Sequence, residues 1–405
     1  MRLLNRVLDY ISDDEEYGGC GSYTSASVLD AVRRVVEKPS RLHSPLLGET
    51  ERALVSECVS SGQVTHGPHV EQFEGRIKTL TRAKHAIAVS SGTAALHLAL
   101  LAAGVSPGDK IVVPSFTFVA TANAVTYCGA IPQFVDCDEF GGLDPNKLDD
   151  WLSTHEVKAV VCVHCFGTCG DMEGLVSVCK KHSVPLIEDA AQAISSYYKA
   201  RHAGTFGLLG AFSFNGNKVI TTGGGGCVVT DDPALAKRVR SLASVAKEDI
   251  PNEFWHAEVG FNYRMPNINA ALGCGQMENL YAIISRKKIL ALRYEEAFSG
   301  NPVVTMMNTR RINTPHRKVS DHGFTYLTGG VDESNHWLNA IILAAPEKRE
   351  ETAKALNENG FECRLGWTPL HYLPMYKNSE RGDLSTTERL AGSIVNLPSG
   401  PGIIA

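Results

Sequence analysis

The chain has 405 residues, of which 43% are hydrophobic and 20% are charged, a composition typical of a globular protein with roughly two to three domains. Its formal net charge of −5 excludes a generally basic surface of the kind that attracts nucleic acid. No apolar run approaches the roughly 18 residues of a membrane span, and the acidic start of the chain is unlike a signal peptide. We therefore expect a cytoplasmic protein that binds neither nucleic acid nor membranes.

The cysteines do not indicate a disulfide scaffold, because there are 11 of them, an odd number, spread along the whole chain. One cluster, "CVHCFGTCGD", brings together Cys162, His164, Cys165 and Cys169, and this spacing would suit a zinc or iron–sulfur site. The cluster continues an apolar run, however, in which cysteine behaves as a small buried hydrophobe. No second CxxC pair completes four ligands, so we expect no metal site.

The N-terminal region, residues 1–44, is polar and predicts a weakly structured arm with at most one short helix. Beyond it, Val70, Phe73, Ile77 and Leu80 recur at helical spacing. This pattern predicts an amphipathic helix that packs onto a sheet.

Between about residues 85 and 230, short apolar runs alternate with segments of helical length, which predicts βαβ units and a largely parallel sheet. Several runs are apolar throughout, as expected for strands buried on both faces. The seven predicted strands are "HAIAV", "KIVVP", "IPQFVD", "KAVVCVHC", "VPLIEDA", "GAFSFN" and "GCVVT". The predicted helices between them are "SGTAALHLALLAAG", "TFVATANAVTYCG" and "GDMEGLVSVCKKHS". We assign residues 45–265 to this large domain.

Residues 266–405 begin with a helical pattern of over thirty residues, "PNINAALGCGQMENLYAIISRKKILALRYEEAFSG", in which Gly273 and Gly275 are candidate bends. A strand "HWLNAIIL", a helix "PEKREETAKALNENG" and a short strand "FECR" follow. This segment predicts a long connecting helix and a smaller C-terminal α+β domain.

Ligands of an open parallel sheet bind outside the carboxyl ends of its strands, so the residues after each strand are the candidates for chemistry. After "HAIAV", the turn "SSGTAALHL" opens a helix whose first N–H groups suit a phosphate or carboxylate. Gly92 permits close approach and Thr93 adds a hydroxyl, although the same turn could be only an N-cap. After "VPLI", Asp189 ends a buried strand, which is costly unless the carboxylate has a partner or a task; capping is the alternative.

After "GAFSFN" comes Lys218, 29 positions beyond Asp189 and followed by the run "GGGG". A P-loop is excluded because the lysine precedes the glycines and Val219 follows it, and no GxGxxG opens a helix after the first strand. A phosphate site, a carboxylate and a lysine at different strand ends instead suit pyridoxal phosphate (PLP). A lysine binds its aldehyde, a carboxylate keeps its ring nitrogen protonated, and an aromatic such as Phe116 or Phe118 covers the ring.

Five motifs carry a resemblance: "SSGTAALHLAL", "PSFTFVATANAV", "IEDAAQA", "FSFNGNK" before the glycine run, and "GFNYRMPNINAALG". The chain resembles the PLP-dependent sugar aminotransferases of the DegT/DnrJ/EryC1/StrS family from "HSPLLGETERALVSECVSSGQVTHGPHVEQFE" to its carboxyl end. The resemblance implies an α/β protein of the fold-type-I, aspartate aminotransferase-like class. Such a protein has a large domain with a mostly parallel seven-stranded sheet and a smaller C-terminal α+β domain.

The resemblance also implies roles around the cofactor ring. Lys218 would be the lysine that binds the cofactor and shuttles protons, and Asp189 would pair with the pyridine nitrogen. Gln192 would lie near the ring. Phe118 would stack on it, with Phe116 as the alternative.

For the cofactor phosphate, the resemblance implies Gly92 and Thr93 together with the hydroxyl of Ser213. The segment that contains "GFNYRM" reaches across a homodimer interface in the family. Asn262 would therefore complete the phosphate site of the other subunit, and Arg264 would bind substrate nearby.

The motifs "SFNGNK", "ESNHWLNAIIL" and "NLPSGPG" most resemble the branch that aminates C4 of UDP-linked 4-keto-6-deoxy-N-acetylhexosamines. His336 and Trp337 stand where that branch carries the same pair, which makes His336 a substrate-binding candidate; a satisfied core histidine is its alternative. His164 matches a histidine that the family often has after this strand, and a structural role for it is equally open.

We therefore expect a homodimeric PLP enzyme that moves an amino group from L-glutamate to the C4 ketone of such a nucleotide-linked sugar, with L-glutamine as an open alternative donor. A 3-keto or dTDP-sugar aminotransferase of the same family stays open. So do another fold-type-I enzyme acting on an amino acid and a non-catalytic ligand-sensing homologue. Lys218 argues against the dehydratase branch of the family, which carries histidine in its place.

Overall fold

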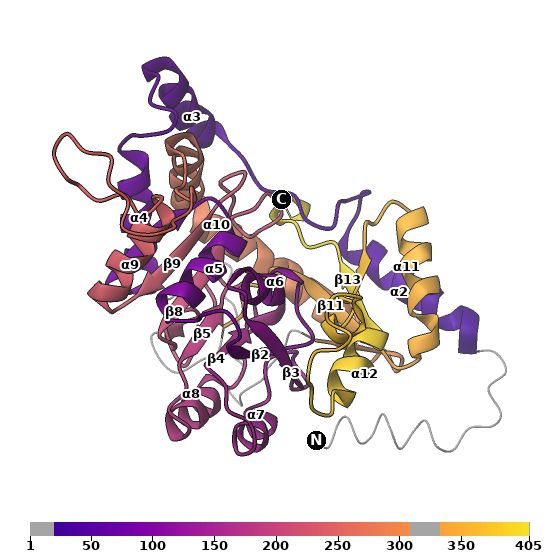
Figure 1. Cartoon of the computed structure of the whole chain (residues 1–405). Coiled ribbons are helices and arrows are strands. Elements are labelled where there is room, and N and C mark those ends of the chain that lie inside the picture. The colour runs from indigo at the N-terminus through magenta and orange to yellow at the C-terminus, as the bar shows by residue number, and fades with distance from the viewer. Residues whose placement is uncertain (1–19, 308–332, 405) are drawn as a thin grey trace.

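The computed structural model describes residues 20–307 and 333–404, which form a large unit and a small unit (Figure 1). The large unit contains a seven-stranded sheet, and all seven predicted strands are confirmed. Their bounds are β1 (His85–Val89), β2 (Lys110–Pro114), β3 (Ile131–Val135), β4 (Ala159–Val163), β5 (Leu186–Asp189), β8 (Leu209–Ser213) and β9 (Gly226–Thr230).

The strand order is β1-β9-β8-β5-β4-β2-β3. Strand β9 is antiparallel to both of its neighbours, whereas the pairs from β8 to β3 are parallel. The carboxyl ends of every strand except β9 therefore meet at one edge of the sheet, where β9 begins. This edge is where the sequence places the candidate site residues.

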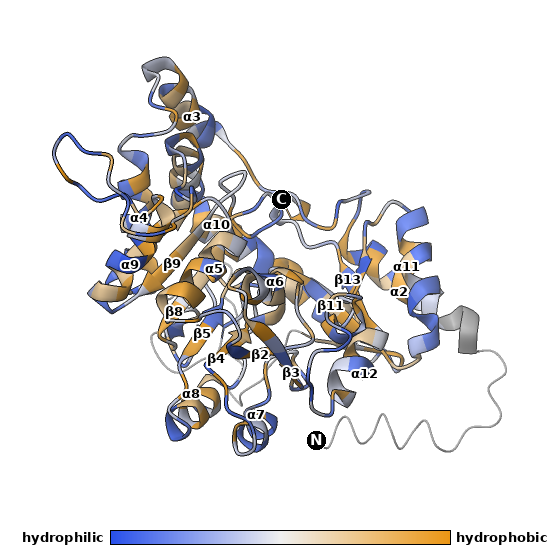
Figure 2. Cartoon of the chain, viewed as in Figure 1, coloured by the Kyte–Doolittle hydropathy of each residue, from blue (hydrophilic) through white to orange (hydrophobic). Residues whose placement is uncertain are grey.

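Helices cover both faces of the sheet. Alternate residues of each strand face two different hydrophobic cores, as Val160 and Cys162 face one and Val161 the other. The first face is covered by α4 (His69–Thr81), α7 (Pro145–Leu152), α8 (Met172–Lys181) and α10 (Asn267–Ala297), and the second by α5 (Gly92–Ala102), α6 (Ala120–Tyr127) and α9 (Pro233–Ala243). Figure 2 shows β8 and β9 as largely hydrophobic, which agrees with strands buried on both faces.

The long connecting helix is confirmed as α10, which runs without interruption through the two predicted bends. A side chain at Gly273 would meet Phe73 of α4 at 2.7 Å, and one at Gly275 would meet Glu51 of α3 (Glu49–Ser61) at 2.8 Å. These glycines therefore let two neighbouring helices pack closely against α10.

The small unit is built on an antiparallel four-stranded sheet in the order β10-β11-β13-β12. The predicted strand and helix are present as β11 (Asn339–Leu343) and α11 (Arg349–Glu358). The predicted strand "FECR" is limited to β12 (Arg364–Leu365). Elements that the sequence analysis did not predict are β6 (Tyr197–Tyr198), β7 (Arg201–His202), β10 (Val304–Met306), β13 (Ile394–Leu397), α3, α7, α9 and α12 (Ser385–Ser393).

The N-terminal arm differs from the prediction. Residues 20–35 form a 16-residue helix, α2 (Cys20–Val35), in the small unit. Val28 and Val32 of α2 are fully buried in a core that also contains Leu290 of α10 and Leu356 of α11. The charged residues Asp30, Arg33 and Arg34 lie on the exposed side of this helix, so overall polarity concealed an amphipathic pattern. Residues 1–19 lie outside the described part. No helix among the described residues has the length and apolar character needed to cross a bilayer.

We expect Val32→Ala to lower the free energy of unfolding by about 2 kcal/mol, because the variant removes buried methyl groups from the core of the small unit. The matched control is Asp30→Ala, which lies on the exposed side of α2 and loses only a surface ion pair, worth about 0.5 kcal/mol or less. Urea unfolding followed by circular dichroism measures both variants. Equal losses would show that α2 is not part of this core.

Candidate active site

A cavity of about 540 Å³ opens at the carboxyl edge of the large sheet. The large unit lines it with the start of α5 and the ends of β5 and β8, and the small unit contributes Trp337, Arg364 and Asn396. The cavity therefore lies where the two units meet. Seven of the predicted site residues line it: Gly92, Thr93, Phe118, Asp189, Gln192, Ser213 and Lys218.

Lys218 lies in the loop that follows β8, where its backbone N–H donates to the carbonyl of Asn215 at 3.0 Å. Its ammonium nitrogen lies 4.1 Å from the centre of the Trp337 ring. Among the described residues, no carboxylate lies within ion-pair distance of this nitrogen. Burial lowers the pKa of Lys218 to about 8, against a smaller opposing effect of the Asp189 charge. A substantial fraction of this amine is therefore neutral near physiological pH.

Asp189 ends β5 and is buried. Its carboxylate accepts a hydrogen bond from the Thr121 hydroxyl at 2.8 Å and another from the backbone N–H of Ala191 at 3.1 Å. Burial raises the pKa of Asp189, and these hydrogen bonds together with the charge of Lys218 oppose the increase. Within the described ranges, the carboxylate has no cation at ion-pair distance, so its negative charge is incompletely compensated.

The start of α5 is pressed against the end of β8. Ser91 caps the helix by accepting a hydrogen bond from the Ala94 N–H at 3.0 Å, and the first N–H groups of a helix have no partner inside it. A side chain on Gly92 would collide with Ser213 at 2.5 Å, and one on Gly226 would collide with the Ser91 carbonyl at 2.4 Å. Both glycines are thus required for close approach, which places helix N–H groups and the Ser213 hydroxyl beside one another.

The structure distinguishes between the two aromatic residues that were candidates for stacking on the cofactor ring. Phe118 is 55% exposed and lines the cavity, whereas Phe116 is fully buried in the core below it. Gln192 also lines the cavity, and its side-chain oxygen accepts a hydrogen bond from the Phe166 N–H at 2.7 Å. Phe118 and Gln192 can therefore contact a ligand in the cavity.

His164 lies behind this site, with its Nε2 2.9 Å from a carboxylate oxygen of the buried Glu188. The same carboxylate accepts hydrogen bonds from the Gly204 and Gly207 N–H groups. Burial by itself disfavours the imidazolium, but Cys169 and Glu188 raise the pKa of His164 to about 10. His164 does not line the cavity, and its contact with the buried Glu188 favours a structural role.

Three predicted site residues, Asn262, Arg264 and His336, do not line this cavity in the single chain. Asn262 and Arg264 are exposed and line another cavity, of about 480 Å³, with His66 and Ser90. His336 lines neither cavity, and burial with the nearby Lys287 charge lowers the pKa of its imidazole to about 3.

His43 is a cavity residue that the sequence analysis did not identify. Both nitrogens of its ring are buried and have no hydrogen-bond partner within the part of the chain that the structure describes. Burial and the charges of Lys287 and Lys218 hold the pKa of His43 well below its usual range, so the ring is neutral. The segment is held in place because the Leu42 carbonyl accepts a hydrogen bond from the Ser399 N–H at 2.6 Å. Only the tertiary structure brings this segment to the site.

The cysteine cluster is buried, and its thiols are free. Burial raises the pKa values of Cys162 and Cys165 well above the usual range of a thiol. In residues 20–307 and 333–404, no group of three or more histidine, cysteine or carboxylate side chains is arranged to hold a metal ion.

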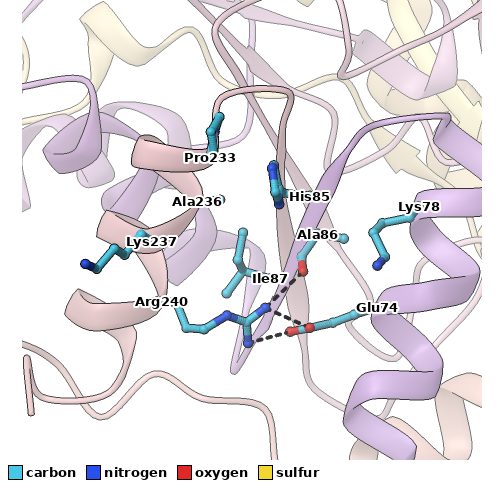
Figure 3. A pocket seen from close by; sticks show the side chains of 9 residues that line it. All are labelled: Glu74, Lys78, His85, Ala86, Ile87, Pro233, Ala236, Lys237 and Arg240. Carbon is cyan, nitrogen blue, oxygen red and sulfur yellow. Dashed lines mark hydrogen bonds and ion pairs between the residues drawn. The ribbon is translucent and has the colours of Figure 1, made fainter. Parts of the chain in front are cut away.

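A further cavity, of about 300 Å³, lies between α4, β1 and α9 (Figure 3). There Arg240 and Glu74 point toward each other, with an ion pair of 2.8 Å, while Lys78 and Lys237 lie on opposite sides. Glu74 also accepts the Ala88 N–H at 2.9 Å, and Arg240 donates to the Ala86 carbonyl at 3.4 Å. The two charges thus compensate each other and join both helices to the edge strand.

The residues around Lys218 fit pyridoxal phosphate. The buried Asp189 carboxylate lacks a cation, which a protonated pyridine nitrogen would supply. The start of α5 and Ser213 offer hydrogen-bond donors of the kind that bind phosphate. Lys218 offers an amine in the same cavity.

Comparisons with known proteins agree with this chemistry. The model of the DegT/DnrJ/EryC1/StrS aminotransferase family matches residues 45–404. GDP-perosamine synthase of Escherichia coli O157:H7 is 36% identical over 364 residues, covering 89% of this chain and 93% of its own. The spore coat polysaccharide biosynthesis protein SpsC of Bacillus subtilis (strain 168) is 36% identical over 347 residues, covering 82% of each chain.

Solved structures are similar over the same extent. PseC of Helicobacter pylori, an aminotransferase involved in pseudoaminic acid biosynthesis, has a TM-score of 0.79 at 25% identity and covers 89% of this chain and 94% of its own. The aminotransferase TlmJ of Streptoalloteichus hindustanus has a TM-score of 0.80 at 29% identity, with the same coverage. The chain therefore belongs to the DegT/DnrJ/EryC1/StrS aminotransferase family and is a PLP-dependent sugar aminotransferase of fold type I.

Proposed function

We propose that this enzyme transfers an amino group from L-glutamate to the C4 ketone of a UDP-linked 4-keto-6-deoxy-N-acetylhexosamine. The observation that carries the proposal is the cavity in which Lys218, with a lowered pKa, and the buried Asp189 occur together at the ends of neighbouring strands. A desolvated amine and an uncompensated carboxylate suit proton transfer beside a protonated ring.

The mechanism assigns each residue a task. Bound PLP supplies the aldehyde that carries the amino group and a ring that withdraws electrons from the reacting carbon. The neutral Nζ of Lys218 would remove the proton from the α-carbon of the donor, and in the second half-reaction its ammonium form would deliver a proton to C4 of the sugar. Asp189 accepts a hydrogen bond from the protonated ring nitrogen, and Thr121 keeps the carboxylate oriented.

The remaining cavity residues bind and orient the cofactor. Gly92 and Thr93 present backbone N–H groups, and Ser213 its hydroxyl, to the phosphate. Phe118 would stack on the cofactor ring and Gln192 would lie near it, since both line the cavity. Because these groups come from different elements of one rigid sheet edge, the reacting carbon is held within reach of Lys218.

We also propose that the active form is a homodimer. Asn262 and Arg264 lie outside the Lys218 cavity of their own chain and are exposed, as a pair that serves the other subunit would be. In the loop that precedes them, Phe254 is 88% exposed and Val259 is 85% exposed, and such exposed apolar groups mark an interaction surface. In this dimer, Asn262 completes the phosphate site of the other subunit and Arg264 contacts the substrate there.

The motifs around Lys218 and Trp337 support the UDP-linked substrate. GDP-perosamine synthase at 36% identity supports a second candidate, a GDP-linked keto sugar. His336 stays a proposed substrate contact, and its ring does not line the cavity of its own chain. L-glutamate is the proposed donor in both cases.

Lys218→Ala should reduce transamination by about 10⁴-fold or more, because the variant has neither the cofactor-binding amine nor the proton shuttle. The visible absorbance of the lysine-linked cofactor should disappear as well. Initial rates with L-glutamate and a keto sugar, together with an absorbance spectrum, measure these losses. The exposed Lys237 provides the control Lys237→Ala, which should be active; an active Lys218→Ala enzyme would refute the proposal.

Asp189→Asn should lower kcat by about 10²-fold or more, because the amide stabilises the ring-nitrogen proton less than the carboxylate does. The cofactor-free variant should melt no lower than the original protein, because it loses a buried charge with a raised pKa. Steady-state kinetics and thermal unfolding test the two statements separately. Normal turnover would show that Asp189 does not have this role.

The sugar nucleotide can be identified by titrating the amino form of the enzyme with UDP-, GDP- and dTDP-linked 4-keto and 3-keto sugars. We expect the UDP-linked 4-keto-N-acetyl sugar to restore the lysine-linked absorbance with about 10²-fold higher kcat/KM than the others. A preference for the GDP-linked sugar would establish the second candidate. The same assay, run in reverse with L-glutamate and L-glutamine, identifies the donor.

A further inference from the structure

We propose that Trp337 is a positioning residue for Lys218, whose aromatic face stabilises the ammonium form that the lysine adopts each time it accepts a proton. This inference rests on the proposed function, since it assigns a task to the lysine proposed as proton shuttle. It goes beyond that function by adding a residue from the small unit to the proton-transfer machinery.

The contact between the two residues is direct. The Nζ of Lys218 lies 4.1 Å from the centre of the Trp337 ring, well within the range of a cation–π interaction. The indole Nε1–H donates to the carbonyl of Asn217, the residue before the lysine, at 2.7 Å. Trp337 is 6% exposed and lines the cavity. One side chain thus holds both the backbone beside the lysine and its charged end.

Trp337 is itself fixed from two sides. Its backbone N–H donates to the side-chain oxygen of Asn335 at 2.8 Å, and the Asn335 amide donates to the carbonyls of Gln192 and Ile194, each at 2.8 Å. The backbone carbonyl of Trp337 accepts a hydrogen bond from the fully buried Lys287 at 3.2 Å. These bonds fix the backbone of Trp337, and rotation of the indole would break its own hydrogen bond to the Asn217 carbonyl.

The charged groups near the Lys218 amine do not contact it as the Trp337 indole does. Among the described residues, Asp189 is the carboxylate whose charge raises the pKa of the amine, against the larger lowering effect of burial. His43 faces the same cavity as a neutral ring, Lys287 lies beyond the Trp337 carbonyl, and Arg364 pairs with Glu362 at 3.4 Å. With no carboxylate in contact, the negative face of the indole is the group that stabilises the ammonium ion.

The opposing effects have a chemical consequence. Burial favours the neutral amine, which removes a proton, while the ring stabilises the charged amine, which must then return it. An amine with both influences has a pKa near the operating pH, where transfer in both directions is efficient.

The experiment measures the pKa of Lys218 in the cofactor-free protein, so its result does not depend on turnover. The rate at which fluorodinitrobenzene modifies Lys218 is followed against pH by mass spectrometry of the peptide, with Lys218→Ala as the blank. In Trp337→Leu the pKa should lie about one unit below that of Trp337→Phe, because phenylalanine keeps an aromatic face and leucine does not. Both variants remove the indole N–H and open space in the cavity. The difference between their Lys218 pKa values therefore reports the effect of the aromatic face alone.

Trp367 supplies the matched control. It lines the same cavity and stacks on Phe166 with ring centres 4.6 Å apart, away from the Lys218 amine. Trp367→Leu should change the pKa of Lys218 by much less than Trp337→Leu does. Equal pKa values in the leucine and phenylalanine variants, or an equal shift in Trp367→Leu, would overturn the inference.

The outcomes separate this inference from the proposed function. If Lys218→Ala lacks transamination while Lys218 has the same pKa in both Trp337 variants, the proposed function is supported and the proposed role of Trp337 is wrong. If Lys218→Ala is active while the pKa values differ, the contact is real but Lys218 is not the shuttle.

Discussion

The site depends on one constraint, the burial of a lysine and a carboxylate that are not paired with each other. Lys218 and Asp189 line one cavity, yet neither has an ion-pair partner among the described residues. Burial displaces both pKa values toward the neutral forms, downward for the amine and upward for the carboxyl. Such an arrangement costs stability, and it persists because β5 and β8, the strands that carry these residues, are paired in a sheet with buried faces.

Close packing at the sheet edge turns these separate groups into one binding surface. In the glycine run after Lys218, Gly223 has a positive φ of 76°, a backbone conformation that glycine adopts readily. The last glycine of the run, Gly226, has a different task, since it admits the Ser91 carbonyl, just as Gly92 admits Ser213. Small residues on three elements thus bring a helix start and a strand end within reach of one ligand.

The large sheet was predictable because its strands are buried on both faces and leave continuous apolar runs, as in "AVVCV". The small unit was less predictable, because β10 and β12 have only three and two residues. Strands of this length are too short to show an alternation of apolar and polar residues. Seven site residues followed from their places at strand ends or from family motifs. His43 did not, because its place in the cavity depends on a hydrogen bond between the neighbouring Leu42 and Ser399, which are far apart in the sequence, and no local pattern indicates that contact. Likewise, the resemblance matched Trp337 to a residue of one branch, but no local pattern indicated that it contacts Lys218.

The two units contribute to the cavity in different ways, and this division bears on specificity. The large unit supplies the amine, the carboxylate and the helix start, the groups that we propose act on the cofactor. The small unit supplies Trp337, Arg364 and Asn396, which face the same space from the opposite side. Groups that act on the cofactor cannot distinguish one sugar nucleotide from another. We therefore expect discrimination among substrates to come from Arg364 and Asn396 of the small unit, whose replacement would leave the contact between Trp337 and Lys218 in place.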